Sequence, residues 1–355
     1  MKALEYALIY LVPVSVIIGL MSGNLFIFLT PLLVFGLVPL LDLAFAKDID
    51  NPTADQAQAL SGNLIYRLVF WGCVPLQVVM VVWGASVATE WSLSVEELIG
   101  FTLSMGISSA VMGLTVAHEL AHREKGSLEY LLSKIVLATV LYAHWGMDHV
   151  IGHHQDLGTP KDPSTAKMGE SLYHFLPRSI SGGFNRIWSI EAARQEQKRR
   201  PVWNLNNPMV TVLLGQVVLL IGIALAFGAP GFFYFVFQAM IAVCLLETVN
   251  YIGHYGLARE IASDGRYEDV AFHHSWNAGS RLTSRFLFNL GRHSDHYAHP
   301  GRHYQLLHHH AHSPQLPAGY PAMVLLALVP PLWRSTMDNR ASNSSIQRLL
   351  ARPED

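Results

Sequence analysis

Regularly spaced histidines are the residues of this chain best suited to chemistry. The segment VAHELAHRE at 116–124 places His118 and His122 four residues apart, with Glu119 between them. On a helix, two histidines at this spacing lie on one face and can bind zinc, with the glutamate as the base of a protease. The same pair can instead be one corner of a larger metal site, so the rest of the chain has to decide.

Further histidines recur at ligand-like spacing. They lie in DHVIGHH, NYIGHYGL and GRHSDHYAHP, and are His149, His153, His154, His254, His293, His296 and His299. In the first of these segments the four-residue step repeats the spacing of His118 and His122, and the adjacent histidine reaches a second point. All 18 histidines lie between residues 118 and 312. This one-sided distribution predicts a common site rather than scattered core histidines.

The number of histidines indicates two metal ions rather than one. A tetrahedral zinc takes about four ligands, whereas at least eight histidines have ligand-like spacing here. Neutral imidazole binds zinc, copper, iron and nickel, so ligand type alone does not identify the metal. We interpret the run HHHAH at 308–312 as a solvated loop, and we assign no ligand role to His144, His174, His273 or His274.

The composition predicts an all-α membrane protein. Of its 355 residues, 51% are hydrophobic and only 14% are charged, which is unusual for a soluble protein. A membrane-spanning helix needs about 20 apolar residues. We predict a polytopic bundle of six transmembrane helices with a histidine-rich cytoplasmic cap, the helices being 4–21, 25–46, 67–88, 97–117, 209–228 and 231–252.

The basic residues predict the orientation of these helices. The six form three hairpins, whose short turns begin near residues 21, 88 and 228, and none of the 24 Lys and Arg residues lies in these turns. Because cytoplasmic loops collect basic residues, we place both termini and the histidines on the cytoplasmic side of a bacterial-type inner membrane. The net charge of -2 gives no support to a nucleic-acid partner.

We expect one membrane-embedded domain over residues 1–338. It would carry histidine-rich cytoplasmic segments at 118–208 and 253–312, and a polar tail would follow at 339–355.

The ordered motifs resemble the integral-membrane alkane 1-monooxygenases of the AlkB type. These belong to a wider group with xylene monooxygenase and the membrane fatty acid desaturases. The matching segments are HELAHR, HVIGHHQDLGTPKDPSTA, NYIGHYGL, HHSWN, RHSDHYAHPGRHYQ and LPAGYPAMVLLALVPPLWRSTMD. The resemblance implies a non-haem centre of two iron ions, which uses dioxygen to hydroxylate an unactivated C–H bond. The favoured substrate is the terminal methyl of a medium- or long-chain n-alkane.

The resemblance also implies the metal ligands. They are His118, His122, His149, His153, His154, His254, His293 and His296. Family members usually carry another histidine where this chain has Tyr297, and an acidic or amide residue where it has Gly253. Tyr297 can ligate or pack as a phenol, and His299 can supply the missing imidazole.

Three carboxylates, Glu119, Asp148 and Asp295, each lie beside a proposed ligand. Each can accept the second ring N–H of a ligating histidine and so fix its tautomer. We group them with Tyr297 as catalytic candidates, although a helix-surface role explains each carboxylate as well.

Electrons for this reaction must come from another protein, because the chain has no flavin or nicotinamide fingerprint. The resemblance implies rubredoxin, or a ferredoxin, together with a reductase. The alkyl substrate would enter from the bilayer lipid. The basic run RQEQKRR from residue 194 can receive an acidic redox protein or contact lipid phosphate.

Other functions stay open from the sequence. An aromatic-methyl hydroxylase of the xylene type, or a fatty acyl desaturase or hydroxylase, would keep the iron centre. A membrane zinc protease would require Glu119 and no oxygen. A metal transporter would place ligands along its spans, but the predicted spans contain no histidine before their cytoplasmic ends.

The alignment of the last histidine motif predicts the outcome of replacing Tyr297. The variant Tyr297→His is expected to keep or raise the iron content of the purified protein, because it restores an imidazole. Metal analysis of protein purified in detergent measures this, and a sharp loss of iron would contradict the alignment.

Overall fold

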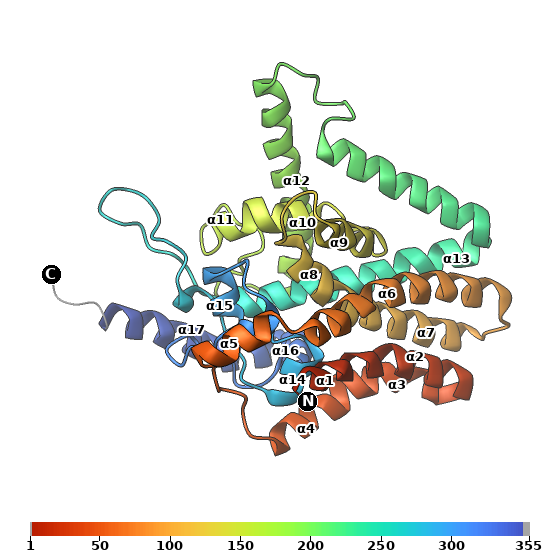
Figure 1. The fold of residues 1–355 in the computed structure, drawn as a ribbon, viewed down its shortest axis with the longest axis horizontal. Helices are drawn as coiled ribbons and strands as arrows, with labels where there is room; N and C mark the ends of the chain where they lie inside the picture. Colours follow the sequence, from red (N-terminus) through yellow and green to blue (C-terminus); the bar gives the residue numbers. More distant parts are fainter. Residues whose placement is uncertain (1, 351–355) are drawn as a thin grey trace. The chain divides into compact units, whose positions relative to one another are not determined.

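The structure, a computed structural model, describes residues 2–350 and is all-α as predicted (Figure 1). The α-helices are α1 (Lys2–Glu5), α2 (Leu11–Ser22), α3 (Leu29–Pro31), α4 (Val38–Ala44), α5 (Ala54–Ser61), α6 (Leu64–Glu90), α7 (Val95–Ser108), α8 (Thr115–Ala121), α9 (Leu128–Ala138), α10 (Trp145–Asp148), α11 (His154–Asp156), α12 (Leu172–Gln197), α13 (Pro208–His254), α14 (Arg281–Phe286), α15 (His293–Ala298), α16 (Tyr320–Ala327) and α17 (Pro330–Leu350).

Short 3-10 or π segments extend or join these helices. The 3-10 segments are η1 (Tyr6–Tyr10), η2 (Asn24–Phe28), η6 (Phe272–His274) and η7 (Tyr304–Leu306), and the π segments are η3 (Leu32–Leu37), η4 (Ser109–Leu114) and η5 (His149–His153). π turns are rare and are frequent at functional sites. One of them, η4, directly precedes the helix that carries His118, and another, η5, begins at His149 and ends at His153.

Five helices in the described part of the chain are long and apolar enough to cross a membrane. Their bounds are Ala3–Ser22, Asn24–Ala44, Leu64–Glu90, Val95–Ala121 and Pro208–His254. The first four correspond to the first four predicted spans. The fifth, α13, contains both remaining predicted spans within its 47 residues.

Gly228 interrupts α13 at the predicted third hairpin turn. Its backbone angles, φ 64° and ψ −165°, are not helical, and only glycine adopts such a conformation readily. Figure 1 shows α13 reversing its direction at the right-hand end of the view. A straight helix of this length would measure about 70 Å, more than twice the hydrocarbon core of about 30 Å. The count of six spans stays a prediction that this kink supports.

Capping residues define the other turns. Gly23, with φ 65°, ends α2 at the predicted first turn. Ser94 begins α7 with a capping box, in which its hydroxyl accepts from the Glu97 N–H and the Glu97 carboxylate accepts from the Ser94 N–H. The same carboxylate accepts from the N–H of Asn24, at 3.3 Å. This polar contact therefore joins the first and second predicted hairpins near their turns, away from the histidine motifs.

The chain divides into two compact units. The first contains the described residues of Met1–Gly36, Leu64–Gly152 and Gly183–Leu246, and the second contains those of Leu37–Asn63, His153–Gly182 and Glu247–Asp355. The prediction of one domain over 1–338 stays a prediction.

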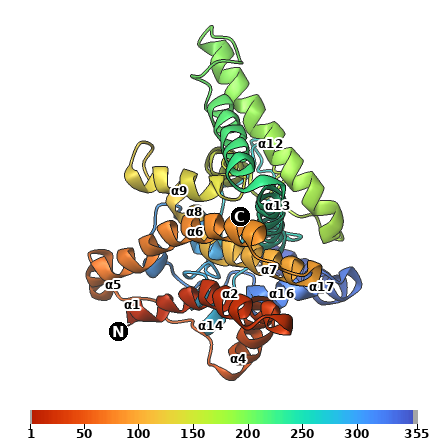
Figure 2. The ribbon, with the colours of Figure 1, turned by 90° about the vertical axis from the view of Figure 1, so that its right-hand side faces the viewer.

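The first unit has an apolar core between its long helices. In Figure 2, α6 and α7 run side by side and α2 lies along α7. Phe101 stacks on Tyr234 with ring centroids 5.7 Å apart, and Trp83 meets Phe101 edge-on at 5.9 Å. Large apolar side chains also cover the outside of the spans: Leu25 is 81% exposed and Leu225 is 83% exposed. Such a surface is expected to face lipid rather than water.

A buried polar network crosses the first unit. Gln77 donates to the hydroxyls of Ser109, at 2.9 Å, and Thr139, at 3.2 Å. The Ser109 hydroxyl donates to the Gln238 side-chain oxygen at 2.9 Å, and the Gln238 amide donates to the Thr139 carbonyl at 2.8 Å. Each polar group thus has a partner inside an apolar core, where leaving it unpaired would be costly.

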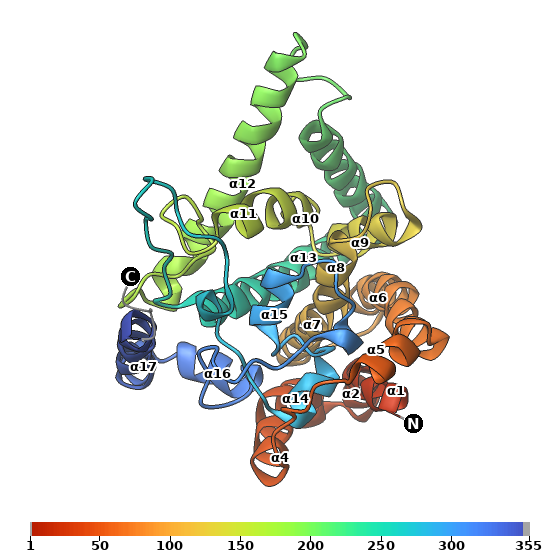
Figure 3. The same ribbon diagram turned by 60° about the vertical axis from the view of Figure 1, so that its left-hand side comes forward.

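In the second unit, hydrogen bonds and an ion pair connect α4 and the residues that follow it to α14. The carboxylate of Asp42, in α4, accepts from the N–H of Leu282 at 2.7 Å and from that of Thr283 at 3.1 Å, which caps the start of α14. Figure 3 shows α14 directly beside α4. Asp48 forms an ion pair with Arg285 at 2.8 Å.

The predicted polar tail begins inside a helix. Helix α17 continues to Leu350, so residues 339–350 are helical. The remainder of the tail, 351–355, lies outside the described residues.

The buried network makes Gln238 a determinant of stability. Replacing it with alanine leaves the Ser109 hydroxyl and the Thr139 carbonyl without this partner, and each such loss costs about 1–3 kcal/mol. Gln238→Ala is therefore expected to lower the free energy of unfolding in detergent by at least this amount, measured by denaturant titration. The exposed Gln58 serves as the matched control, and an equal effect of Gln58→Ala would contradict the assignment.

Candidate metal centre

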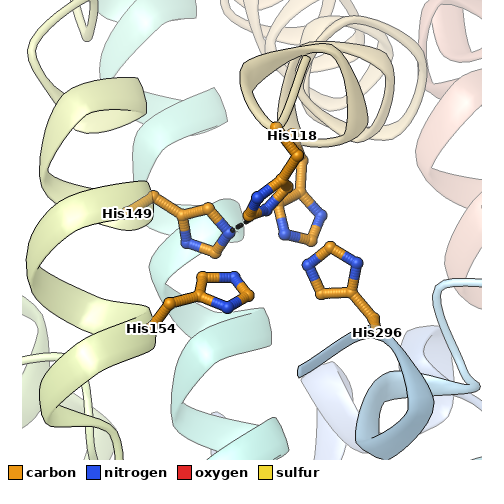
Figure 4. A group of neighbouring side chains, drawn as sticks. His118, His149, His154 and His296 are labelled. Atoms are coloured by element: carbon orange, nitrogen blue, oxygen red, sulfur yellow. Dashed lines mark hydrogen bonds between the residues drawn. The ribbon is translucent and has the colours of Figure 1, made fainter. Parts of the chain in front are cut away.

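Three histidines of the first unit form one cluster. His118 and His122 come from α8, and His149 comes from η5. The rings of His118 and His149 are 4.4 Å apart, and the Nε2 atoms of His122 and His149 are 3.1 Å apart. One ring nitrogen of each residue lies within 4.8 Å of those of the other two. Figure 4 shows His118 and His149 with their rings directed toward one another.

Aromatic stacking and an ion pair fix the helix that carries His149. The indole of Trp145 stacks on the His149 ring, with centroids 4.4 Å apart and an angle of 15°. The neighbouring Asp148 binds Arg186 through both carboxylate oxygens, at 2.7 and 2.6 Å, in a nearly buried pair. Asp148 thus anchors this segment to α12, and a direct bond to a ligating imidazole stays a prediction.

Glu119 is paired with an arginine. Its carboxylate accepts from the Arg123 guanidinium at 2.6 Å, one helical turn further on. This contact has the i, i+4 spacing of a helical ion pair, and both side chains are largely buried. A bond from Glu119 to a ligating imidazole stays a prediction.

The second unit holds the other proposed ligands in a second cluster. They come from η5, α11, the end of α13, and α15, and are His153, His154, His254, His293 and His296, with Tyr297 among them. Ring centroids are 5.0 Å apart for His153 and His254, 5.1 Å for His254 and His293, and 5.2 Å for His154 and His296. Figure 4 shows the rings of His154 and His296 directed toward one another.

Hydrogen bonds on the outer side orient two of these rings. The Nδ1 atom of His153 lies 2.8 Å from a carboxylate oxygen of Asp162, and the Nδ1 atom of His254 lies 3.4 Å from the backbone carbonyl of His274. Since a carboxylate only accepts, Nδ1 of His153 carries the proton and its Nε2 offers a lone pair. Metal-binding histidines usually have this arrangement. The Nδ1 atom of His254 also lies 3.4 Å from the hydroxyl of Ser275, which can donate or accept.

Asp162 was not singled out from the sequence. It lies within the quoted motif GTPKDPSTA, nine residues after His153, and is buried. Its other carboxylate oxygen, Oδ1, accepts from the N–H of Ser164 at 3.1 Å, in a local turn, and the Thr165 hydroxyl donates at 2.6 Å to Oδ2, the oxygen that faces His153. An aspartate in a Pro- and Ser/Thr-rich turn directly after a histidine motif was the available signal.

Tyr297 lies among the histidines of the second unit. Its phenol oxygen is 2.5 Å from His153 Nε2 and 3.1 Å from His254 Nε2, and the side chain is buried. Burial, and next the negative charge of Asp162, raise the pKa of this phenol well above its usual value. Without a cation nearby, Tyr297 is therefore a neutral phenol.

His293 occupies the space beside Gly253. A Cβ atom at Gly253 would come within 2.9 Å of His293 Nε2. Any side chain here would have to displace that ring. The close packing of His293 against Gly253 therefore explains why this position carries no acidic or amide side chain.

Asp295 anchors α15. It is fully buried and accepts from Arg302 at 2.7 and 2.6 Å, from the N–H of His308 at 2.9 Å, and pairs with His310 Nε2 at 2.9 Å. Burial alone would raise the pKa of this carboxyl, but these hydrogen bonds outweigh it and the pKa is lowered. His299 also lies beside Asp295, with its Nδ1 atom 3.2 Å away. Asp295 thus holds the loop that follows α15.

Two buried histidines lie outside the proposed ligand set. His144 contacts Phe184 edge-on at 5.2 Å, and burial lowers its pKa to about 4. His274 pairs with Glu268 at 3.1 Å, and one ligand atom each of Glu268, His273 and His274 lies within 4.8 Å of the others. His274 Nδ1 also accepts from the N–H of Ala271. These contacts keep the Phe272–His274 turn in place.

The donor set of both clusters fits a transition metal. Imidazole nitrogens converge from separate segments, and His153 presents the lone pair of Nε2 to the cluster interior while its Nδ1 proton points outward to Asp162. A positive ion satisfies several inward-facing lone pairs at once, which no set of further imidazoles can do.

The chain matches the family model described as fatty acid desaturase over residues 97–327. It is 43% identical to alkane 1-monooxygenase 1 of Pseudomonas aeruginosa over 86% of this chain and 80% of that protein. It is 38% identical to alkane 1-monooxygenase of Pseudomonas putida over 87% of this chain and 76% of that protein. The hydroxylase component of xylene/toluene monooxygenase of Pseudomonas putida is 27% identical over 94% of this chain and 87% of that protein.

The His153–Asp162 bond makes Asp162 a positioning residue for metal binding. Asp162→Asn removes the charged acceptor that fixes the His153 tautomer, and losses of this kind typically weaken metal affinity about 10- to 100-fold. Competition with a chelator measures the change. The exposed Asp269 provides the control Asp269→Asn, and unchanged affinity in Asp162→Asn would show that the bond does not orient a ligand.

Proposed function

Since the chain belongs to the alkane 1-monooxygenases of the fatty acid desaturase family, we propose that it is a membrane oxidoreductase that hydroxylates n-alkanes. The proposed reaction uses dioxygen and acts on the terminal methyl of a medium- or long-chain substrate. The observation that carries the proposal is the convergence of imidazoles from distant segments, with the rings of His153 and His254 only 5.0 Å apart.

The proposed cofactor is a pair of iron ions. The ligands would be the three histidines of the first unit and the five of the second, namely His118, His122, His149, His153, His154, His254, His293 and His296. When bound, the iron would activate dioxygen for the oxidation of a methyl C–H bond, which no side chain can perform. Imidazole does not select iron over zinc or copper, so the choice of iron rests on the family.

The chain's own residues would position the ligands and exclude water. Trp145 fixes the ring plane of His149, Asp162 fixes the tautomer of His153, and Asp295 anchors the helix that carries His293 and His296. His254 is fully buried, so bulk water has no access to its ring. Such rigid support is what a precise catalytic geometry requires.

The proposed substrate enters from the bilayer. The spans present apolar side chains outward, and an alkane has no polar group to recognise. Each methylene contributes only about 0.8 kcal/mol of transfer free energy. Chain length would therefore be selected by the point at which side chains block the path rather than by specific contacts.

The proposed setting is a bacterial-type inner membrane, with the termini and the metal centre in the cytoplasm. The distribution of the 24 basic residues supports this orientation. The proposed electron donor is rubredoxin, or a ferredoxin, with its reductase.

A second candidate is hydroxylation of an aromatic methyl group. The 27% identity to the xylene/toluene monooxygenase component favours it, and the proposed ligand set would be the same. The zinc-protease alternative needs Glu119 as a base, but this carboxylate is engaged by Arg123.

Product analysis tests the proposal. Protein purified in detergent, loaded with iron and supplied with NADH, reductase and rubredoxin, is expected to convert octane or hexadecane to the 1-alkanol. With ¹⁸O₂ as oxidant, the label is expected in the hydroxyl group. p-Xylene and a fatty acyl substrate serve as parallel substrates.

Histidine variants provide the matched controls. His154→Ala is expected to lose product formation, whereas His312→Ala, at an exposed position outside the cluster, is expected to retain it. A 4-methylbenzyl alcohol product without alkanol would favour the second candidate. Product formation without oxygen would reject oxygenase chemistry altogether.

A further inference from the structure

Tyr297 stands among the proposed ligands of the second unit, and its oxygen rather than its ring edge meets the imidazole nitrogens. We propose that Tyr297 binds one of the metal ions through its phenol oxygen, together with His153 and His254. This inference rests on the proposed metal centre and assigns a specific oxygen ligand within it.

Three donor atoms converge at this point. The phenol oxygen of Tyr297 lies 2.5 Å from His153 Nε2 and 3.1 Å from His254 Nε2. The three residues come from α15, η5 and the end of α13. All are nearly inaccessible to solvent, with exposures of 4%, 1% and 0% respectively.

Metal coordination would use all three donor atoms at once. The Nδ1 atom of His153 faces a carboxylate, which only accepts, so its Nε2 offers a lone pair toward Tyr297. The Nδ1 atom of His254 lies 3.4 Å from both the His274 carbonyl and the Ser275 hydroxyl. One metal ion can accept lone pairs from the phenol oxygen and from both Nε2 atoms.

The spacing of the donor atoms suits one ion. Ligands about 2.0–2.1 Å from a metal and at right angles to one another are about 2.9 Å apart. The two distances from the Tyr297 oxygen to the Nε2 atoms, 2.5 and 3.1 Å, lie on either side of this value. Small shifts of the rings would therefore allow the oxygen and both nitrogens to bind one ion. No rearrangement of a helix is needed.

Packing accounts for the ring of Tyr297 but not for its oxygen. The ring lies 4.5 Å from that of His154 and 4.9 Å from that of His293. A phenylalanine would make the same ring contacts. The oxygen is the only part of Tyr297 that meets His153 Nε2 and His254 Nε2 at hydrogen-bond distance.

His299, the other candidate ligand, is held elsewhere. Its Nδ1 atom is 3.2 Å from Asp295, and its side chain is 45% exposed. The nearby oxygen of Tyr297 is therefore the additional ligand that the geometry favours.

On coordination, a bond from the Tyr297 oxygen to the metal replaces its O–H bond, and no group is oxidised or reduced. The O–H bond of Tyr297 ionises, its proton leaves to solvent, and the phenolate oxygen binds the ferric ion. Metal uptake should accordingly release one proton more in the wild type than in Tyr297→Phe.

Absorption and resonance Raman spectroscopy of the ferric protein test the inference independently of turnover. Phenolate bound to ferric iron gives a visible charge-transfer band and enhanced tyrosinate vibrations. Wild-type protein is expected to show both. Tyr297→Phe and Tyr297→His are expected to lose both, and the histidine variant should keep the wild-type iron content.

Tyr320→Phe is the matched control. Tyr320 is fully buried, and its ring lies 6.2 Å from that of His293, so it tests whether any nearby tyrosine can produce the band. This variant is expected to retain the band. Ferric wild-type protein without the band, or a band that survives in Tyr297→Phe, overturns the inference while leaving the iron centre intact. A wild-type protein that takes up no iron overturns both this inference and the proposed function.

Discussion

A buried imidazole needs a partner for each of its two nitrogens, and the second unit is organised around this requirement. His153 and His254 each have a polar partner for Nδ1 on the outer side, which leaves Nε2 for the interior of the cluster. These partners come from a tight turn and from a backbone carbonyl. Without them the rings could rotate or change tautomer, and the lone pairs would no longer converge.

In the first unit, other buried polar side chains find partners within an apolar interior. Gln77, Ser109 and Gln238 satisfy one another between the long helices, and Asp148 is neutralised by Arg186 beside His149. These side chains are thus paired inside an apolar interior, where an unpaired polar group would be costly. The outer surface of the spans is apolar and suited to lipid.

Gly253 and Tyr297, the two positions at which the resemblance implies other residues, are structurally connected. Gly253 precedes His254, whose Nε2 atom faces Tyr297, and the space that a side chain at Gly253 would fill belongs to His293. His293 in turn packs against the Tyr297 ring at 4.9 Å. A change at one position therefore alters the surroundings of the other, and a larger residue at Gly253 would disturb the rings around Tyr297.

The sequence by itself determined the helical class, the positions of the apolar spans and the histidines to be considered, because these follow from local composition and spacing. The tertiary structure decided the partners. It paired Glu119 with Arg123 and Asp148 with Arg186. It revealed the contact of Asp162 with His153, which the sequence had not indicated. It also placed the oxygen of Tyr297 against two imidazoles. Spacing along a chain fixes which residues share a helix face, but the atom that each side chain meets depends on how distant segments pack, and no local pattern encodes that.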